Sequence, residues 1–290
     1  MRKGFFVTAL LILFIFTSNG HALDYKALIQ QLNNTTVIGS YPSGIPKRKC
    51  HEAYHILESE LKKKPVNSKL VNLLIEAVLN SKSPRIRFRS VLLLGEVKTE
   101  RILSILERVL STDKDAHVRK CAALEIGFHR QERSIPVLIK ALNDPSLSVR
   151  LEAITALGKI GRSATPILIK MLRTELARKK IRIVTTTRLI YALMSTKDRR
   201  AIDVLIQSAS HENPSLRAHS VRALGLFSIE AKRYSHGVIC SAGAPVDSKY
   251  KIQEKDRQRA KQAIIKALSD PHKWVRKSAE EIWAIIDKLR

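Results

Sequence analysis

The strongest constraint on the fold of this chain is a stretch that it repeats. Residues 141–161 read ALNDPSLSVRLEAITALGKIG, and residues 267–287 read ALSDPHKWVRKSAEEIWAIID. Aligned through an aliphatic residue followed by arginine, the chain contains six copies, with Arg87, Arg119, Arg150, Arg182, Arg217 and Arg276. The first five follow at steps of 31 to 35 residues, and the sixth comes after a step of 59. Such a period predicts an array of small units that bury their apolar faces by stacking.

Two positions behave alike in all copies. The seventh residue after the arginine is large and apolar: Leu94, Ile126, Leu157, Leu189, Leu224 and Trp283. The third residue after it is small: Ser90, Ala122, Ala153, Thr185, Ser220 and Ala279. This spacing predicts one buried helix face, which a neighbouring helix approaches closely at the small position.

Four of these helices share a start signal, and each has an apolar segment upstream. Four copies begin with a capping side chain followed by proline: Ser83-Pro84, Asp144-Pro145, Asn213-Pro214 and Asp270-Pro271. Before the helix comes an apolar segment with three-four spacing, such as IPVLIKALN at 135–143. Aromatic residues make up 5% of the chain, which suits aliphatic helix packing better than sheets. The sequence therefore predicts an all-α protein of antiparallel helix pairs.

The repeat resembles the HEAT repeat, with DPSLSVRLEAITALGKIG as its clearest copy, and in particular the short variety of proteins similar to phycocyanobilin lyases. The resemblance covers residues 65–290 and implies an α-solenoid, a superhelix of about six antiparallel two-helix HEAT-like repeats. It also implies that the six arginines form a structural ladder with acidic residues between repeats. Asp113, Asp144 and Asp270 are the candidate partners, and other residue types near the equivalent places make the expected ladder incomplete.

The ends of the array suggest a division of the chain. Residues 1–22 carry Arg2 and Lys3, an uncharged apolar run and small residues at Gly20 and Ala22, which predicts a secretory signal peptide. After cleavage the protein would be periplasmic or extracellular, and the alternative is an N-terminal membrane anchor. Residues 23–64 are expected to form a helical cap and linker, and 65–290 the array. The long last step places an inserted loop at 229–256.

The net charge of the chain predicts an anionic binding partner. Lysine and arginine total 52 against 26 aspartate and glutamate residues, a formal net charge of +26. Such a field attracts polyanions without defining a fold. The run of Arg178, Lys179, Lys180 and Arg182 is the clearest candidate for this binding, and the alternative is a solvated face.

A variable column gives the candidate partner surface. Two residues after each arginine stand Arg89, Cys121, Glu152, Val184, His219 and Ser278. A column this varied is expected to be exposed rather than buried. The HEAT resemblance implies that the second helix of each pair lines the concave side, so these residues are candidates for partner binding, with a merely solvated helix face as the alternative.

Signals for catalysis or cofactors are weak. Neither a glycine-rich phosphate loop, a nucleophile elbow, a zinc-protease helix nor a Cys-x-x-Cys pair occurs, so no catalytic, cofactor-binding or metal residue is predicted. Cys50, His51 and His55 resemble metal ligands, but no second cluster accompanies them, which favours packed or solvated roles. The chain has three cysteines, which allow either one disulfide plus one thiol or three thiols: Cys50, Cys121 and Cys240.

Three function classes follow from these observations. The favoured one is an exported non-enzymatic scaffold that binds a protein or an anionic envelope polymer through a basic concave surface. The family resemblance also implies a bilin-lyase-like enzyme or chaperone, and the charge a basic HEAT-like nucleic-acid-binding protein; export argues against both. A membrane surface is a further candidate partner. The partner's identity and the oligomeric state stay open.

Overall fold

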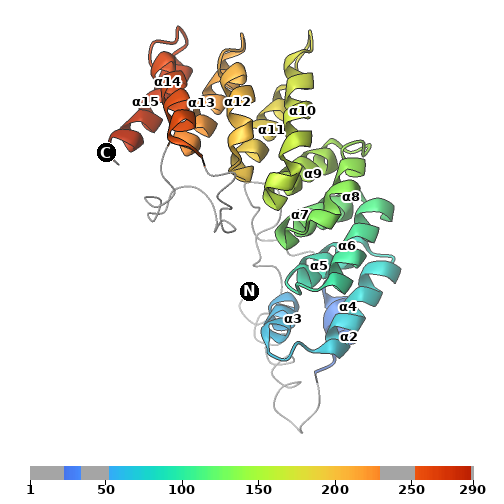
Figure 1. The fold of residues 1–290 in the computed structure, drawn as a ribbon. Helices are drawn as coiled ribbons and strands as arrows, with labels where there is room; N and C mark the ends of the chain where they lie inside the picture. Colours follow the sequence, from blue (N-terminus) through green and yellow to red (C-terminus); the bar gives the residue numbers. More distant parts are fainter. Residues whose placement is uncertain (1–22, 34–51, 229–251, 289–290) are drawn as a thin grey trace, which may run out of the picture. The chain divides into compact units, whose positions relative to one another are not determined.

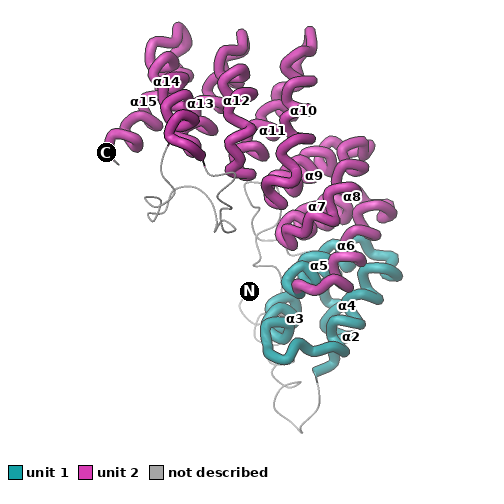
Figure 2. Tube along the Cα trace, viewed as in Figure 1, with its two compact units in different colours: residues 1–97 teal, residues 98–290 magenta. Residues whose placement is uncertain are grey.

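A computed structural model describes residues 23–33, 52–228 and 252–288. They belong to two compact units, Met1–Val97 and Lys98–Arg290 (Figure 2). Within the described ranges the regular structure is entirely helical, with no strand. The all-α prediction is therefore confirmed. The boundary after Val97 lies inside the stretch predicted as one array, after its first helix pair.

The first unit contains four described helices. They are α2 (Tyr25–Gln31), α3 (Glu52–Lys62), α4 (Ser68–Asn80) and α5 (Pro84–Gly95). The helices α4 and α5 pack against each other as the first predicted pair. The side chain of Asn67 caps α4, and Ser83 Oγ accepts a hydrogen bond from the Ile86 N–H at the start of α5. The predicted Ser-Pro start is thus confirmed here.

The described part of the second unit contains five helix pairs. Its first helices are α6 (Glu100–Thr112), α8 (Ile135–Ala141), α10 (Thr165–Leu176), α12 (Ile202–Ala209) and α14 (Glu254–Ala267). Its second helices are α7 (Ala116–His129), α9 (Leu147–Ile160), α11 (Ile183–Thr196), α13 (Pro214–Ser228) and α15 (Lys273–Lys288). Each second helix packs against the next, so they form one layer, and the first helices form another (Figure 1). This arrangement is an α-solenoid.

Apolar side chains between the two layers form the core of this unit. Ile126, Leu157 and Leu224, from the predicted large column, are fully buried. Glycine sets the spacing of the second helices, because a Cβ on Gly158 would lie 2.7 Å from the Ala192 Cα. A side chain there would force two backbones apart.

The repeated arginines hold the start of each second helix. Nη1 of Arg119 donates to the carbonyl oxygens of Asp113 and Lys114, the residues six and five positions before it. The same two contacts recur at Arg87, Arg150, Arg217 and Arg276. Each arginine therefore binds the loop that leads into its own helix, which is a structural role.

Two of these arginines also reach the following repeat. Arg119 makes a two-bond contact with Asp144, through Nε and Nη2, at 2.8 and 2.9 Å. Arg217 does the same with Asp270, at 2.8 Å for both bonds. Both acidic residues are among the predicted ladder partners. The described part of the ladder thus contains two inter-repeat links of the second unit.

The fourth copy shows that its predicted register is wrong by one helical turn. In every other copy the arginine is the fourth residue of the helix, whereas Arg182 precedes α11 as its N-cap residue. The fourth residue of α11 is Thr186, which is fully buried and donates its hydroxyl to the Arg182 carbonyl. Because Ile181-Arg182 imitates the motif one turn early, the ladder has no arginine in this repeat.

The ends of the second helices confirm the corrected register. Arg130 and Lys197 have φ of 53° and 52°, and Gly161 has φ of 104°. Each lies the same number of residues after the fourth residue of its helix. Arg130 follows Arg119, Gly161 follows Arg150, and Lys197 follows Thr186 at this separation. A left-handed position that glycine usually fills is therefore occupied by a basic residue in two repeats.

Candidate interaction surface on the second helices

The predicted partner column is mostly buried, and the expectation of exposure is wrong for it. Arg89, Cys121, Glu152 and Ser278 are each less than a tenth exposed. Cys121 on α7 interacts with Glu152 on α9, whereas Arg89 donates to the carbonyl of Leu32 at the end of α2, so the contacts at this position differ between copies. Their role in partner binding stays a prediction.

The fourth member of the column changes with the register. Val184 is the second residue of α11 and is 59% exposed, outside the buried layer. Arg188 is the residue that occupies the equivalent place. Its Nη1 donates to Thr155 Oγ1 at 3.4 Å, which links α11 to α9.

Similar contacts continue along the layer toward α15. The Tyr191 hydroxyl lies 2.8 Å from His219 Nδ1, which links α11 to α13. Arg222 Nη2 donates to Glu281 Oε2 at 3.3 Å, which links α13 to α15. We call the six side chains of these three contacts the polar row: Thr155, Arg188, Tyr191, His219, Arg222 and Glu281. It joins four consecutive second helices, and sequence reasoning identified one of its residues, His219.

Buried acidic groups lie between α7 and α9, at one end of this layer. Glu125 and Glu152 are 5% and 7% exposed. Burial raises the pKa of Glu152, against the charges of Lys159, Lys120 and Arg188, which lower it. Burial and the nearby carboxylates raise the pKa of the Cys121 thiol well above its usual value. A thiol in this state is a poor nucleophile at neutral pH.

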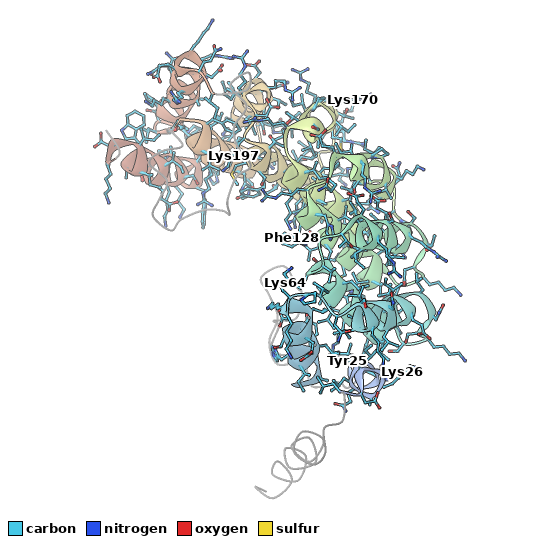
Figure 3. The ribbon with its side chains drawn as sticks, turned by 60° about the horizontal axis from the view of Figure 1, so that its bottom comes forward. Tyr25, Lys26, Lys64, Phe128, Lys170 and Lys197 are labelled. Atoms are coloured by element: carbon cyan, nitrogen blue, oxygen red, sulfur yellow. The ribbon has the colours of Figure 1, made fainter. Side chains whose placement is uncertain are left out.

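An aromatic ring and an amine cover the end of this region. The Nζ of Lys159 lies 3.4 Å from the centre of the Phe128 ring, a cation–π contact. Phe128 is 50% exposed. Figure 3 shows Phe128 and Lys197 on one side of the second unit, with Lys170 on the other. The second-helix layer therefore presents an aromatic residue beside basic ones.

Next to Phe128 is a small pocket, which we call the α6–α7 pocket. Its volume is about 220 Å³, and its lining residues are Lys98, Thr99, Glu100, Leu103, Phe128, His129 and Gln131. Leu103 and His129 are buried, whereas Lys98 and Gln131 are exposed. Burial and the charges of Lys98 and Arg133 lower the pKa of His129 to about 4. The imidazole is thus neutral at physiological pH.

The predicted basic run is partly tied to the fold. Arg178 and Arg182 both donate to Glu175, which is 3% exposed. Both guanidinium groups therefore form ion pairs with a buried carboxylate. Lys179 and Lys180 are exposed, and the part of the chain that the structure describes gives them no ion-pair partner.

Several predictions lie wholly or partly outside the described residues. These are the signal peptide at 1–22, most of the inserted loop at 229–256, and Cys50, His51 and Cys240. His55 is described, and its Nδ1 lies 3.6 Å from Glu58 Oε2. Across the described ranges, no three His, Cys, Asp or Glu side chains gather as a metal ion would require. In the same ranges, no helix combines the length and apolar character needed to cross a membrane.

Comparison with known families identifies the repeat. Residues 71–145 and 109–185 match the family model of HEAT repeats. This part of the chain therefore consists of HEAT repeats, and the resemblance inferred from the sequence is confirmed. Among the curated proteins, none matches the chain.

Solved structures similar to this chain share its fold. Kap121p matches with a TM-score of 0.55 at 13% identity, over 91% of this chain and 29% of that protein. The complex of CpcE and CpcF of phycocyanin lyase from Nostoc sp. PCC7120 matches with a TM-score of 0.43 at 16% identity, over 94% of this chain and 97% of that one. The archaeal HEAT-like repeats protein from Thermococcus onnurineus NA1 gives a TM-score of 0.47 at 12% identity, over 93% and 99%. At these identities the likeness concerns the fold alone.

Proposed function

We propose that this chain is an exported, non-enzymatic HEAT-repeat scaffold that binds a protein partner through the second-helix layer of residues 98–290. The observation that carries the proposal is the polar row. Its contacts at 2.8 to 3.4 Å fix side chains on α9, α11, α13 and α15 before any partner arrives. Prior ordering lowers the entropy that a partner must pay on binding.

The surface chemistry supports a protein partner. The layer offers hydroxyl, imidazole and guanidinium groups, with the half-exposed Phe128 at one end. Tyrosine, arginine and aromatic side chains are the types enriched in protein interfaces. A polyanion would use charge with little regard to such groups, so an anionic polymer is the competing outcome of the test.

Export is supported by residues 1–22 alone, through their basic start and apolar run. Cell fractionation and sequencing of the mature amino terminus test it. The proposal expects a first residue near Leu23 and a protein outside the cytoplasm. An uncleaved, cytoplasmic protein would contradict export and would favour the enzyme or nucleic-acid alternatives.

The binding surface is tested by photo-crosslinking in intact cells. A photoreactive amino acid replaces Ser195 or Arg222 on the second helices, or Lys170 or Gln207 on the first helices, all of them exposed. We expect one discrete adduct from the second-helix positions, at least about tenfold above that from the first-helix positions. Equal adducts from both layers would contradict the proposed surface.

A further inference from the structure

We propose that an interrupted position of the arginine ladder, between α9 and α11, binds the carboxylate of an aspartate side chain from the protein partner. We call this position the ladder gap and define it by Arg150, Lys180 and Arg182. The inference rests on the proposed function, because it assumes a protein partner, and it adds the chemistry that recognises one part of that partner. All three residues belong to the second unit, where α9 and α11 pack side by side (Figure 1).

The two filled links of the ladder show what such a position binds. Arg119 donates to the Asp144 carboxylate from Nε and Nη2, and the Ser146 N–H donates to Oδ1 of the same carboxylate at 2.8 Å. The link between Arg217 and Asp270 repeats these contacts, and the N–H two residues after the aspartate donates to it at 2.9 Å. Each carboxylate therefore lies between one guanidinium edge and one backbone N–H.

The equivalent acidic position of the intervening repeat holds a lysine. Asp144 and Asp270 each lie three residues before the first residue of their helix, and the same place before α11 is Lys180. Lys180 is exposed. The ladder therefore lacks its carboxylate between α9 and α11, and a positive charge stands at that place in the sequence.

The donors for that carboxylate are nevertheless present. Arg150 Nη1 donates to the carbonyl oxygens of Asp144 and Pro145, which orients its guanidinium as in the filled links. Within the described ranges, Nε and Nη2 of Arg150 make no hydrogen bond. The backbone N–H of Arg182, two residues after Lys180, has no acceptor in the same ranges. The three donors that hold an aspartate in the filled links are therefore unused here.

The carboxylates of the adjoining segments are already bound. Hydrogen bonds from Arg119 lower the pKa of Asp144, and the charge of Arg150 lowers it further without a hydrogen bond. Glu175 is held by two arginines of the segment before α11. Arg150 is partly exposed, so a carboxylate from outside the chain has access to its Nε and Nη2.

The geometry selects a carboxylate from among the anions. A guanidinium edge offers two parallel donors, which match the two oxygens of a carboxylate. The same edge of Arg119 and of Arg217 binds an aspartate in this chain. The contact of the polar row between Thr155 and Arg188 joins the same two helices, α9 and α11. The ladder gap therefore lies on helices that the proposed binding surface already includes.

The experiment records arginine Nε–H and backbone amide NMR signals of the purified protein during titration with a peptide of alternating aspartate and glycine. We expect the Arg150 Nε–H signal and the Arg182 amide signal to shift to saturation. The Arg119 Nε–H and Ser146 amide signals are the internal control and should stay in place, because their carboxylate is already bound. A peptide with asparagine in place of aspartate should move none of these signals.

Two variants separate the ladder gap from general charge attraction. Lys180→Asp supplies the missing carboxylate from the chain itself. It should weaken peptide binding at least about tenfold and raise the melting temperature by about 2–4 °C, because a further charged link then joins α9 and α11. Lys179→Asp makes the same change of charge one residue away and is the matched control. It should weaken binding by less than about threefold and should not raise the melting temperature.

An equal loss of peptide affinity in the two variants would overturn the ladder gap in favour of general charge attraction. Equal shifts of the Arg119 and Arg150 signals would overturn it as well. A response to the asparagine peptide as strong as that to the aspartate peptide, or equally tight saturation by inorganic phosphate, would overturn the recognition of a carboxylate. The crosslinking from Ser195 tests the scaffold proposal separately, since it needs no aspartate in the partner.

Discussion

Arg119 on α7 and Asp144 before α9 form a two-bond ion pair in which both side chains are nearly buried, at 12% and 9% exposure. The guanidinium also binds the carbonyl oxygens of Asp113 and Lys114. One side chain therefore fixes its own loop and the start of the next repeat. This two-bond contact requires arginine, because its planar guanidinium donates two parallel hydrogen bonds to one carboxylate and lysine does not.

Arg119→Met should lower the free energy of unfolding by about 2–4 kcal/mol, because it leaves the Asp144 carboxylate with the Ser146 N–H alone and removes a donor from two carbonyl groups. The matched control is Arg222→Met, at an exposed pair with Glu281, which should cost less than about 1 kcal/mol. Urea denaturation of the two variants makes the comparison. Equal losses would show that Arg119 is an ordinary surface ion pair.

The same pair predicts part of the acid sensitivity. The Arg119 guanidinium lowers the pKa of Asp144, so the folded state favours the carboxylate. This stabilisation is present above the unfolded pKa, about 4 for aspartate, and is lost as pH falls through the lower folded value. Arg119→Met should therefore flatten the stability curve below pH about 4. An unchanged curve in that range would argue against the pair as its source.

His129 predicts a second, separate pH effect. Its pKa is lowered to about 4, whereas an unfolded histidine titrates near 6.5. Between these values the unfolded chain binds more protons, so stability rises with pH over this window and is complete above it. His129→Gln should remove part of that rise, about 2–3 kcal/mol at most. Because the pKa of His219 is also lowered, a residual slope is expected. Stability of both proteins across this window is the measurement, and parallel curves would contradict the assignment.

The close approach of second helices makes one glycine harder to replace than another. A Cβ on Gly158 would meet the Ala192 Cα and carbonyl oxygen at 2.7 and 2.8 Å, whereas one on Gly225 would meet the Ile282 side chain. Backbone cannot yield as a side chain can, so Gly158→Ala should cost at least about 2 kcal/mol more than Gly225→Ala. Thermal denaturation measures the stability of the two variants. A larger loss of stability for Gly225→Ala than for Gly158→Ala would contradict this packing.

The left-handed helix ends predict a stabilising change. Arg130 and Lys197 hold positive φ without being glycine. Arg130→Gly and Lys197→Gly should each raise stability by about 0.5–1 kcal/mol, because glycine adopts this conformation without strain. Lys170→Gly, inside α10, is the control and should lose about 1 kcal/mol. Destabilisation of all three variants in urea would contradict the left-handed assignment.

The paired helices, the starts at Ser83-Pro84 and Asn213-Pro214 and two ladder links were predictable because apolar spacing and loop residues act locally. The predicted starts at Asp144-Pro145 and Asp270-Pro271 were wrong, because α9 begins at Leu147 and α15 at Lys273. The register of α11 was not predictable, since Ile181-Arg182 satisfies the motif while the true position holds Thr186. Burial of Glu152 and Cys121 depends on how close neighbouring helices pack, which residue variability does not report. The α6–α7 pocket joins residues of a loop and two helix ends, for which no periodic signal exists.

If a protein partner binds the second-helix layer, a bulky side chain placed in that layer should block it. Ser195→Trp adds a bulky side chain at an exposed position of α11, and Gln207→Trp adds the same group at an exposed position of α12 in the first-helix layer. With the partner captured by crosslinking, calorimetry measures its affinity for both variants. We expect the affinity to fall at least about tenfold for Ser195→Trp and hardly at all for Gln207→Trp. Unchanged affinity for Ser195→Trp, or an equal loss for both variants, would contradict this expectation.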